Sequence, residues 1–300
     1  MRSSILATTL ALALVACGGG GGTQPGDSCD AKTLCSAGQI CDMTDPAGPA
    51  CLDGSGDLDG DGLANDKDFC EHMAGGAFDE DRDGIGDECD ACPIAKPPAV
   101  AETDGDGVDS PCDPSPTMPG DKIVLFNGFN APLPIKWTAS AAWSVVGGEA
   151  IMTPITPTAI EQLSSVVAGT PHMTIFASYR IDSVAAGATT ADAGVIGVNN
   201  LPLGGGATVK CGGSRSGGAD QLLLTTDAGS GIKPFPNLFN SASLYRVAEQ
   251  IDGANANCAL IADDSNGAVQ TAVSVNAMTD AGLYARGATA RFSYLLVVAR

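Results

Sequence analysis

The chain has 300 residues, which suffices for two domains or for one domain with accessory segments. Its 35 acidic and 15 basic residues give a formal charge of −20, which argues against a nucleic-acid binder, because such proteins displace counterions with clustered Lys and Arg. With only two His residues, the chain has few candidate ligands for a zinc hydrolase and few candidate bases for a His-based triad. Eleven Cys residues indicate an oxidising compartment.

The acidity is concentrated in residues 27–121, which hold 24 acidic and 4 basic residues, whereas residues 122–300 are nearly neutral. The acidic stretch has few large apolar residues, so burial alone cannot offset the entropy of ordering it. We therefore expect cross-links or metal ions to hold this stretch, and a separate globular domain to follow it.

The N-terminus has the form of an export signal. Arg2 precedes an apolar run, Ile5–Ala16, that is too short to span a bilayer. The ending Leu14-Val15-Ala16-Cys17 resembles the bacterial lipobox, which implies removal of residues 1–16, acylation of Cys17 and a lipid anchor in the cell envelope, at the outer membrane or cell surface. The alternative is a plain signal peptide that precedes a Cys. In the lipoprotein prediction, residues 17–26 form a Gly-rich tether after the acylated Cys17.

Four cysteines in residues 27–52 predict a small knot with two disulfides. They are Cys29, Cys35, Cys41 and Cys51. Four Cys allow three connectivities, and the sequence does not choose among them. Zinc is disfavoured here, because an exported chain meets an oxidising environment.

An acidic motif occurs three times, with starts 22 and 23 residues apart. The copies are Asp57-Leu-Asp59-Gly-Asp61-Gly62, Asp79-Glu-Asp81-Arg-Asp83-Gly84 and Glu102-Thr-Asp104-Gly-Asp106-Gly107. Each matches the first half of an EF-hand loop, which places oxygens at positions 1, 3 and 5 and a turn-forming Gly at position 6. The flanking segments lack the amphipathic helices of an EF-hand.

Calcium is the cation that this pattern predicts, because calcium takes six to eight oxygen ligands and alternate carboxylates can converge on one ion. Position 7 would add a backbone carbonyl. The predicted side-chain ligands at positions 1, 3, 5, 9 and 12 are Asp57, Asp59, Asp61, Asn65, Asp68, Asp79, Asp81, Asp83, Asp87, Asp90, Glu102, Asp104, Asp106 and Asp113. The alternative is an acidic, solvated linker without metal.

The pattern Asp-x-Asp-x-Asp-Gly-x-Gly-Asp-x-Cys-Asp, complete at 79–90, resembles thrombospondin type 3 repeats. That resemblance covers about residues 53–116 and implies a nearly coreless stalk held by calcium and disulfides. It also implies bridges from position 14 of one repeat to position 11 of the next, which would be Cys70–Cys89 and Cys92–Cys112. Repeat one departs from the pattern at Lys67, and repeat three begins with Glu.

Residues 120–300 predict a mostly β domain, because short β-like runs alternate with Gly, Pro and Asn clusters and no helical period is sustained. The clearest runs are 122–129, 142–146, 174–181, 194–198, 221–226, 244–251, 268–275 and 290–298. Cys211 and Cys258 lie in β-like runs, so we expect a disulfide between them across the sandwich, rather than two free thiols.

The order of these runs resembles the concanavalin A-like or laminin-G-like jelly roll. The residues that carry the resemblance are Phe126–Phe129, Trp143–Glu149 and the ending Gly282–Val298. The likeness implies a β-sandwich in which a tryptophan strand follows the first strand and the last strand closes the sheet beside the first. The predicted fold class is therefore mostly β, a jelly-roll sandwich preceded by an irregular stapled segment.

No catalytic motif is present, so we expect that the chain is not an enzyme. Retaining glucanases on this jelly roll carry a Glu-x-Asp-x-Glu strand, and none of the three Glu in residues 122–300 lies in such a pattern. His172 is interpreted as structural. Trp137 is the better candidate for an exposed sugar-stacking ring, and Trp143 for core packing.

These features together predict a membrane-anchored lipoprotein whose calcium-binding stalk presents a lectin-like domain for adhesion to glycan, matrix or another cell surface. Two alternatives remain open at this point: a glycoside hydrolase-type jelly roll with an unrecognised site, and a purely structural spacer. The sequence does not identify the ligand.

Overall fold

The structure is a computed structural model that describes residues 28–29, 35–96, 102–199, 207–263, 265–274 and 277–300. The predicted signal peptide, the Gly-rich tether and Cys17 lie outside the described residues. Within these ranges, no helix is long and apolar enough to cross a membrane.

The first part of the chain is a small disulfide-bonded ribbon. Strands β1 (Gln39–Asp42) and β2 (Ala50–Asp53) pair antiparallel. Of the three possible connectivities, the structure has Cys29–Cys41 and Cys35–Cys51. These bonds hold a unit that is too small to bury a core of its own.

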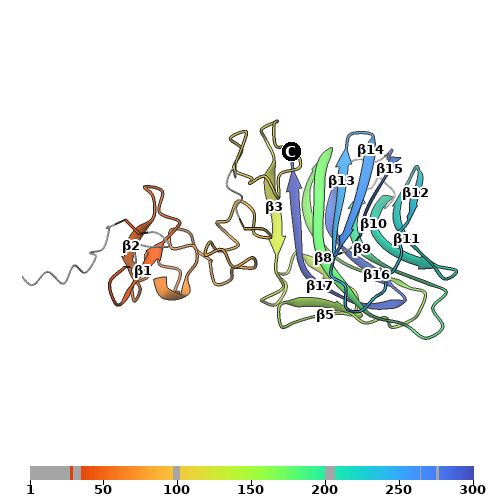
Figure 1. The fold of residues 1–300 in the computed structure, drawn as a ribbon, viewed down its shortest axis with the longest axis horizontal. Helices are drawn as coiled ribbons and strands as arrows, with labels where there is room; N and C mark the ends of the chain where they lie inside the picture. The colour runs from red at the N-terminus through yellow and green to blue at the C-terminus, as the bar shows by residue number, and fades with distance from the viewer. Residues whose placement is uncertain (1–27, 30–34, 97–101, 200–206, 264, 275–276) are drawn as a thin grey trace, which may run out of the picture.

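An irregular acidic segment follows, and turns rather than strands or helices make up most of it (Figure 1). Its only regular element among the described residues is a short 3₁₀ turn, η1 (Asn65–Lys67). Disulfides Cys70–Cys89 and Cys92–Cys112 cross-link it, and both cysteine pairs are those that the thrombospondin resemblance implies.

The remainder of the chain is an antiparallel β-sandwich, so the predicted fold class is confirmed. The 8-stranded sheet, called sheet I here, has the order β15-β14-β13-β8-β17-β6-β5, with β3 paired to β17. Its strands are β3 (Lys122–Asn127), β5 (Trp143–Val146), β6 (Glu149–Met152), β8 (His172–Val184), β13 (Tyr245–Asp252), β14 (Asn255–Ala262), β15 (Ser265–Ala272) and β17 (Ala288–Ala299). The first and last strands of the sandwich therefore lie side by side (Figure 1).

The 7-stranded sheet, called sheet II here, has the order β12-β11-β10-β9-β16-β7-β4. Its strands are β4 (Trp137–Ala139), β7 (Ile160–Thr170), β9 (Thr190–Asn199), β10 (Ala207–Ser216), β11 (Ala219–Thr226), β12 (Gly229–Pro234) and β16 (Met278–Arg286). The disulfide Cys211–Cys258 joins β10 of this sheet to β14 of sheet I.

The core lies between the two sheets, because alternate residues of each strand point inward. Fully buried members from both sheets include Ile175, Phe292, Leu163 and Val195. A second apolar cluster lies on the outer face of sheet I. There Val108 and the Cys92–Cys112 bridge of the acidic segment pack against Leu296 and Val298, so the third repeat is docked on the sandwich.

Candidate functional site

Each of the three acidic loops is organised by its own first residue. The position 1 carboxylate accepts the backbone N–H groups of positions 4 and 6. In the first loop, Asp57 accepts Gly60 N at 2.7 Å and Gly62 N at 3.1 Å. Asp79 and Glu102 do the same in the other two loops, and Glu in place of Asp leaves the pattern intact. Local carboxylate–amide bonds of this kind explain why the short motif folds without a core.

Positions 4 and 6 of each loop adopt positive φ, which explains the glycines found there. In the first and third loops both positions are Gly, with φ between 82° and 101°. In the second loop, position 4 is Arg82, with φ 64°. The tight turn lets three carboxylates approach one another.

Carboxylate oxygens of positions 1, 3 and 5 lie within 4.8 Å of one another in every loop. The three groups are Asp57, Asp59, Asp61; Asp79, Asp81, Asp83; and Glu102, Asp104, Asp106. At position 3, buried oxygens of Asp59, Asp81 and Asp104 have no hydrogen-bond partner among the described residues. Because an unpaired buried carboxylate is costly, these oxygens fit a bound cation, and the clusters can hold one.

The position 12 carboxylates are close enough to their loops for the charges of the loop carboxylates to act on them. Asp68, Asp90 and Asp113 are all buried, and one oxygen of each accepts the N–H two residues on, at 2.6–2.8 Å. Burial raises the pKa of Asp90 to about 7, and the charges of Asp83 and Asp81 add to the shift. Burial raises the pKa of Asp113 to about 6 and that of Asp68 less far, and each also experiences the carboxylates of its own loop.

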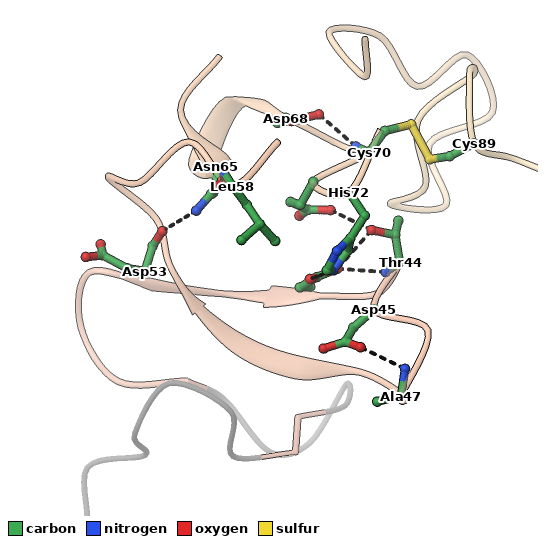
Figure 2. Close-up of polar contacts among 12 residues, drawn as sticks. Thr44, Asp45, Ala47, Asp53, Leu58, Asn65, Asp68, Cys70, His72 and Cys89 are labelled. Carbon is green, nitrogen blue, oxygen red and sulfur yellow. Dashed lines mark hydrogen bonds and ion pairs between the residues drawn. A yellow bond between two sulfur atoms is a disulfide. The ribbon is translucent and has the colours of Figure 1, made fainter. Parts of the chain in front are cut away.

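The side chains at position 9 accept backbone N–H groups of their own loops. The side-chain oxygen of Asn65 accepts the N–H of Leu58 at 3.0 Å, while its amide donates to the Asp53 carbonyl at 2.7 Å (Figure 2). Asp87 likewise accepts the N–H of Glu80 at 2.8 Å. Both residues therefore brace position 2 of their loops, and their role as calcium ligands stays a prediction.

Asp121 is a candidate ligand that the motif did not include. It is 3% exposed, one of its oxygens is buried without a partner among the described residues, and it contributes to the raised pKa of Asp113. Asp106 of the third loop accepts its backbone N–H at 2.8 Å. Asp121 lies 15 residues beyond Asp106, outside the repeat, so only the fold brings it to the third cluster.

A fourth polar cluster lies beside the N-terminal ribbon (Figure 2). One oxygen of the buried Asp42 contacts His72 Nε2 at 2.8 Å, and the other accepts from Thr44. Asp45 offers a further oxygen within 4.8 Å of these two ligand atoms. No sequence repeat marks this group, since its members come from separate segments.

One tryptophan of the sandwich lies differently from the sequence expectation, whereas His172 and Trp143 lie as expected. Trp137 packs edge-on against Phe129, with ring centroids 6.1 Å apart, and its indole nitrogen is buried. It is therefore part of the packing and is not an exposed stacking platform. His172 has a partner, because its Nδ1 lies 2.5 Å from Asp252 Oδ1. Trp143 packs against Phe292, as expected for a core residue.

One carboxyl group lies inside the sandwich core. Glu249 of β13 is fully buried beside Cys258, its neighbour in the pairing of β13 with β14. Neither oxygen has a hydrogen-bond partner within the described chain. The backbone amides of Gly197 and Cys211 lie nearby and favour the charged form of the carboxyl, which lowers its pKa in part. Burial raises the pKa of Glu249 well above its usual value, because the apolar core disfavours the charged form.

A groove of about 510 Å³ lies on the outer face of sheet I, next to the third acidic repeat. Its floor comes from β8, β13, β14 and β15, and Pro111, Asp113 and Pro114 line it from the acidic segment. Its volume falls in the range of small-molecule sites. The groove is therefore built by both parts of the chain.

The outer face of sheet II carries a charged cluster. Asp192 is 2% exposed and forms an ion pair with Arg286, and Lys210 lies 6.0 Å from the ring centroid of Tyr284. Burial raises the pKa of Asp192 and lowers that of Lys210. Gly194, on the same face, lies so close to the next strand that a Cβ would fall 2.1 Å from the Cys211 carbonyl oxygen.

By sequence, no protein family and no curated protein matches this chain. Solved structures resemble it. Xyloglucan PUL GH43B of Bacteroides ovatus aligns with 59% of this chain and 39% of its own, at 13% identity and a TM-score of 0.43. An endo-1,3-β-glucanase from Streptomyces sioyaensis aligns with 60% of this chain over 96% of its own length, at 10% identity and a TM-score of 0.43. The winged bean acidic lectin, complexed with methyl-α-D-galactose, aligns with 60% of this chain over 98% of its own length, at 11% identity and a TM-score of 0.46.

Lectins and glycoside hydrolase chains are both among these similar structures. This chain spans 26–39% of the length of the GH43 chains it resembles, and 40% of a xylan β-1,4-xylosidase from Bacillus halodurans. Because enzymes are among the neighbours, the prediction that the chain is not an enzyme is contradicted. The missing Glu-x-Asp-x-Glu strand excludes one arrangement of catalytic carboxylates, and it does not exclude the others that a jelly roll can carry.

Proposed function

We propose that this is an exported calcium-binding protein, anchored to the cell envelope through acylated Cys17, whose acidic segment positions a glycan-binding sandwich. The observation that carries the calcium part is the set of buried, unpartnered carboxylate oxygens at position 3 of all three loops. Calcium fits because every donor at these loops is an oxygen and because the loops leave several oxygens open for one large cation.

Support for a glycan ligand comes from the chemistry of the groove on sheet I. Most of its hydrogen-bonding side chains are uncharged amides and a hydroxyl, and they lie next to small apolar residues. Sugars present the same combination of hydroxyl groups and apolar C–H faces. Matrix glycans and cell-surface glycans share that chemistry, so adhesion is the role that we assign to the sandwich.

Calorimetric titration of the chelator-treated chain with calcium tests the metal part. The unchanged chain should take up calcium at three loops, with the affinities of extracellular modules, about 0.1–1 mM. Replacing Asp81 and Asp83 by Asn should remove one site, because these residues supply positions 3 and 5 of the second loop. Asp66→Asn is the matched control, since Asp66 is exposed and pairs with Lys67 outside the clusters. Equal stoichiometry in all three proteins would contradict the proposal.

A second candidate function is glycoside hydrolysis, which the charged cluster on sheet II favours. Asp192 combines burial, a raised pKa and a cationic neighbour, a combination that catalytic acids often have. Assays on soluble glucans and xylans test it. Asp192→Asn should lower any hydrolysis about 100-fold or more, as loss of a general acid does. Asp280→Asn, at the other end of the neighbouring strand β16, should not. Hydrolysis that persists unchanged in Asp192→Asn would exclude this residue.

A further inference from the structure

The groove on sheet I contains a row of hydrogen-bonding side chains that runs across four strands. In the strand register, Gln250 pairs with Thr174 on one side and with Asn257 on the other, and Asn257 pairs with Gln270. All four line the groove. The amide of Asn257 donates to Gln250 Oε1 at 3.4 Å, so the row is linked internally. With strands about 4.8 Å apart, the row spans about 14 Å.

A parallel row of apolar residues forms the floor beside it. Ala248 pairs with Phe176 and with Ala259, and Ala259 pairs with Ala268. These three alanines, side by side on three neighbouring strands, leave a trough, because each side chain ends at Cβ. Phe176 closes one end of the row, where it also packs against the docked third repeat. Polar and apolar rows therefore lie side by side along one trough.

The charge of the groove restricts its ligand. Asp113 is the only charged residue among those lining the groove within the described chain, and it faces the third acidic cluster. No described lining residue is basic, so nothing there favours an anionic ligand. Amides and a hydroxyl can both donate and accept, which suits the hydroxyl groups of a sugar, and the alanine floor suits its C–H face.

We propose that this trough binds a neutral oligosaccharide that lies across β8, β13, β14 and β15. Gln250, Asn257 and Gln270 would bond its hydroxyl groups, and the alanine row would contact its rings. The turn at Pro111 and Pro114 would limit the chain at the end nearest the acidic segment. This inference rests on the proposed glycan-binding function, which it deepens by assigning the site to sheet I and the ligand class to neutral sugars.

Binding of the full chain to immobilised neutral hexasaccharides of glucose, xylose and galactose, in the presence of calcium, tests the assignment. Gln250→Ala and Asn257→Ala should each raise the Kd about tenfold, which corresponds to about 1.4 kcal/mol. Ala268→Trp should abolish binding by filling the trough without removing a polar group. Asn266→Ala is the matched control, because Asn266 is an amide residue of the same strand outside the groove.

The outcomes separate the two proposals. Binding that is lost in the trough variants and kept in Asn266→Ala supports the site, provided that thermal unfolding shows every variant folded. Binding that is equal in all variants overturns the site while leaving glycan binding in place. If the unchanged chain binds none of the hexasaccharides, both the site and the proposed glycan binding fail. Stronger binding to sulfated or carboxylated hexasaccharides than to neutral ones would also overturn the ligand class.

Discussion

A single carboxyl group controls how the sandwich core responds to pH. Glu249 lies between the sheets, and its folded-state pKa is raised because burial disfavours the charged form. Above about pH 4.5, the ordinary pKa of Glu, the unfolded chain has lost this proton and the folded chain retains it. The stability contribution is thus complete below that pH and is lost as the pH rises through the folded-state pKa.

Glu249→Gln should remove this dependence, because the amide is similar in shape and does not titrate. We expect the variant to exceed the unchanged chain in unfolding free energy by about 1–3 kcal/mol at alkaline pH, where the buried carboxyl must ionise. Near pH 4 the difference should disappear. Urea unfolding across this range measures the effect, with Glu161→Gln as the control. Parallel pH profiles for Glu249→Gln and the unchanged chain would contradict the expectation.

Individual residues also show which parts of the metal loops the sequence motif can predict. Position 1 can be predicted from spacing alone, because its contacts lie within five residues in the chain. Position 5 also reaches beyond its own loop, since Asp61 accepts the N–H of Gly75 and Asp106 that of Gly120. The bracing role of Asn65 depends on Asp53, 12 residues away, and Asp121 reaches its cluster only through the fold. No local pattern contains this information.

At the level of strands, the sequence predicts those with clear alternation and misses those without it. Alternating burial in Tyr245–Asp252 matches the period of a half-buried strand. Strand β10 has the sequence ATVKCGGSRS, in which the run up to Cys211 is β-like and the Gly and Ser residues after it are typical of a turn. It forms a strand because β9 and β11 pair with it on both sides, so tertiary pairing overrides local preference.

The acidic repeats also differ from the nearly coreless stalk that the sequence predicts. Their third copy buries Val108 and a disulfide on sheet I, and this contact covers Leu296 and Val298. From the sequence alone, the outer face of β17 is expected to be exposed to solvent. Its apolar residues at 296 and 298 are explained only when the docked repeat is seen.

For the whole molecule, the docked repeat connects the metal loops to the sandwich. Removing calcium should loosen the third loop, because its carboxylates then repel one another without a counter-charge. We expect chelator to expose the apolar face at Phe176, Leu296 and Val298, while the sandwich keeps its own core. Hydrogen exchange measures this: amides of residues 102–121 should lose protection, and β9 and β16 should not.

Magnesium at the same ionic strength provides the control for simple charge screening, since it fits such flexible oxygen sites less well than calcium does. Equal protection of residues 102–121 in chelator and in calcium would show that packing alone holds the third repeat. Loss of protection in β16 as well would show that the sandwich depends on the acidic segment for its folding.

The disulfides also decide which ion loops bear tension when the chain is pulled from its N-terminus against a ligand held by the sandwich. Cys70–Cys89 and Cys92–Cys112 provide covalent shortcuts, so residues 79–83 and 102–106 lie off the load-bearing path. The first loop, Asp57 to Asp68, has no such shortcut, because it lies wholly between Cys51 and Cys70. Under load it should therefore extend first, and an ion bound there should leave before the other two.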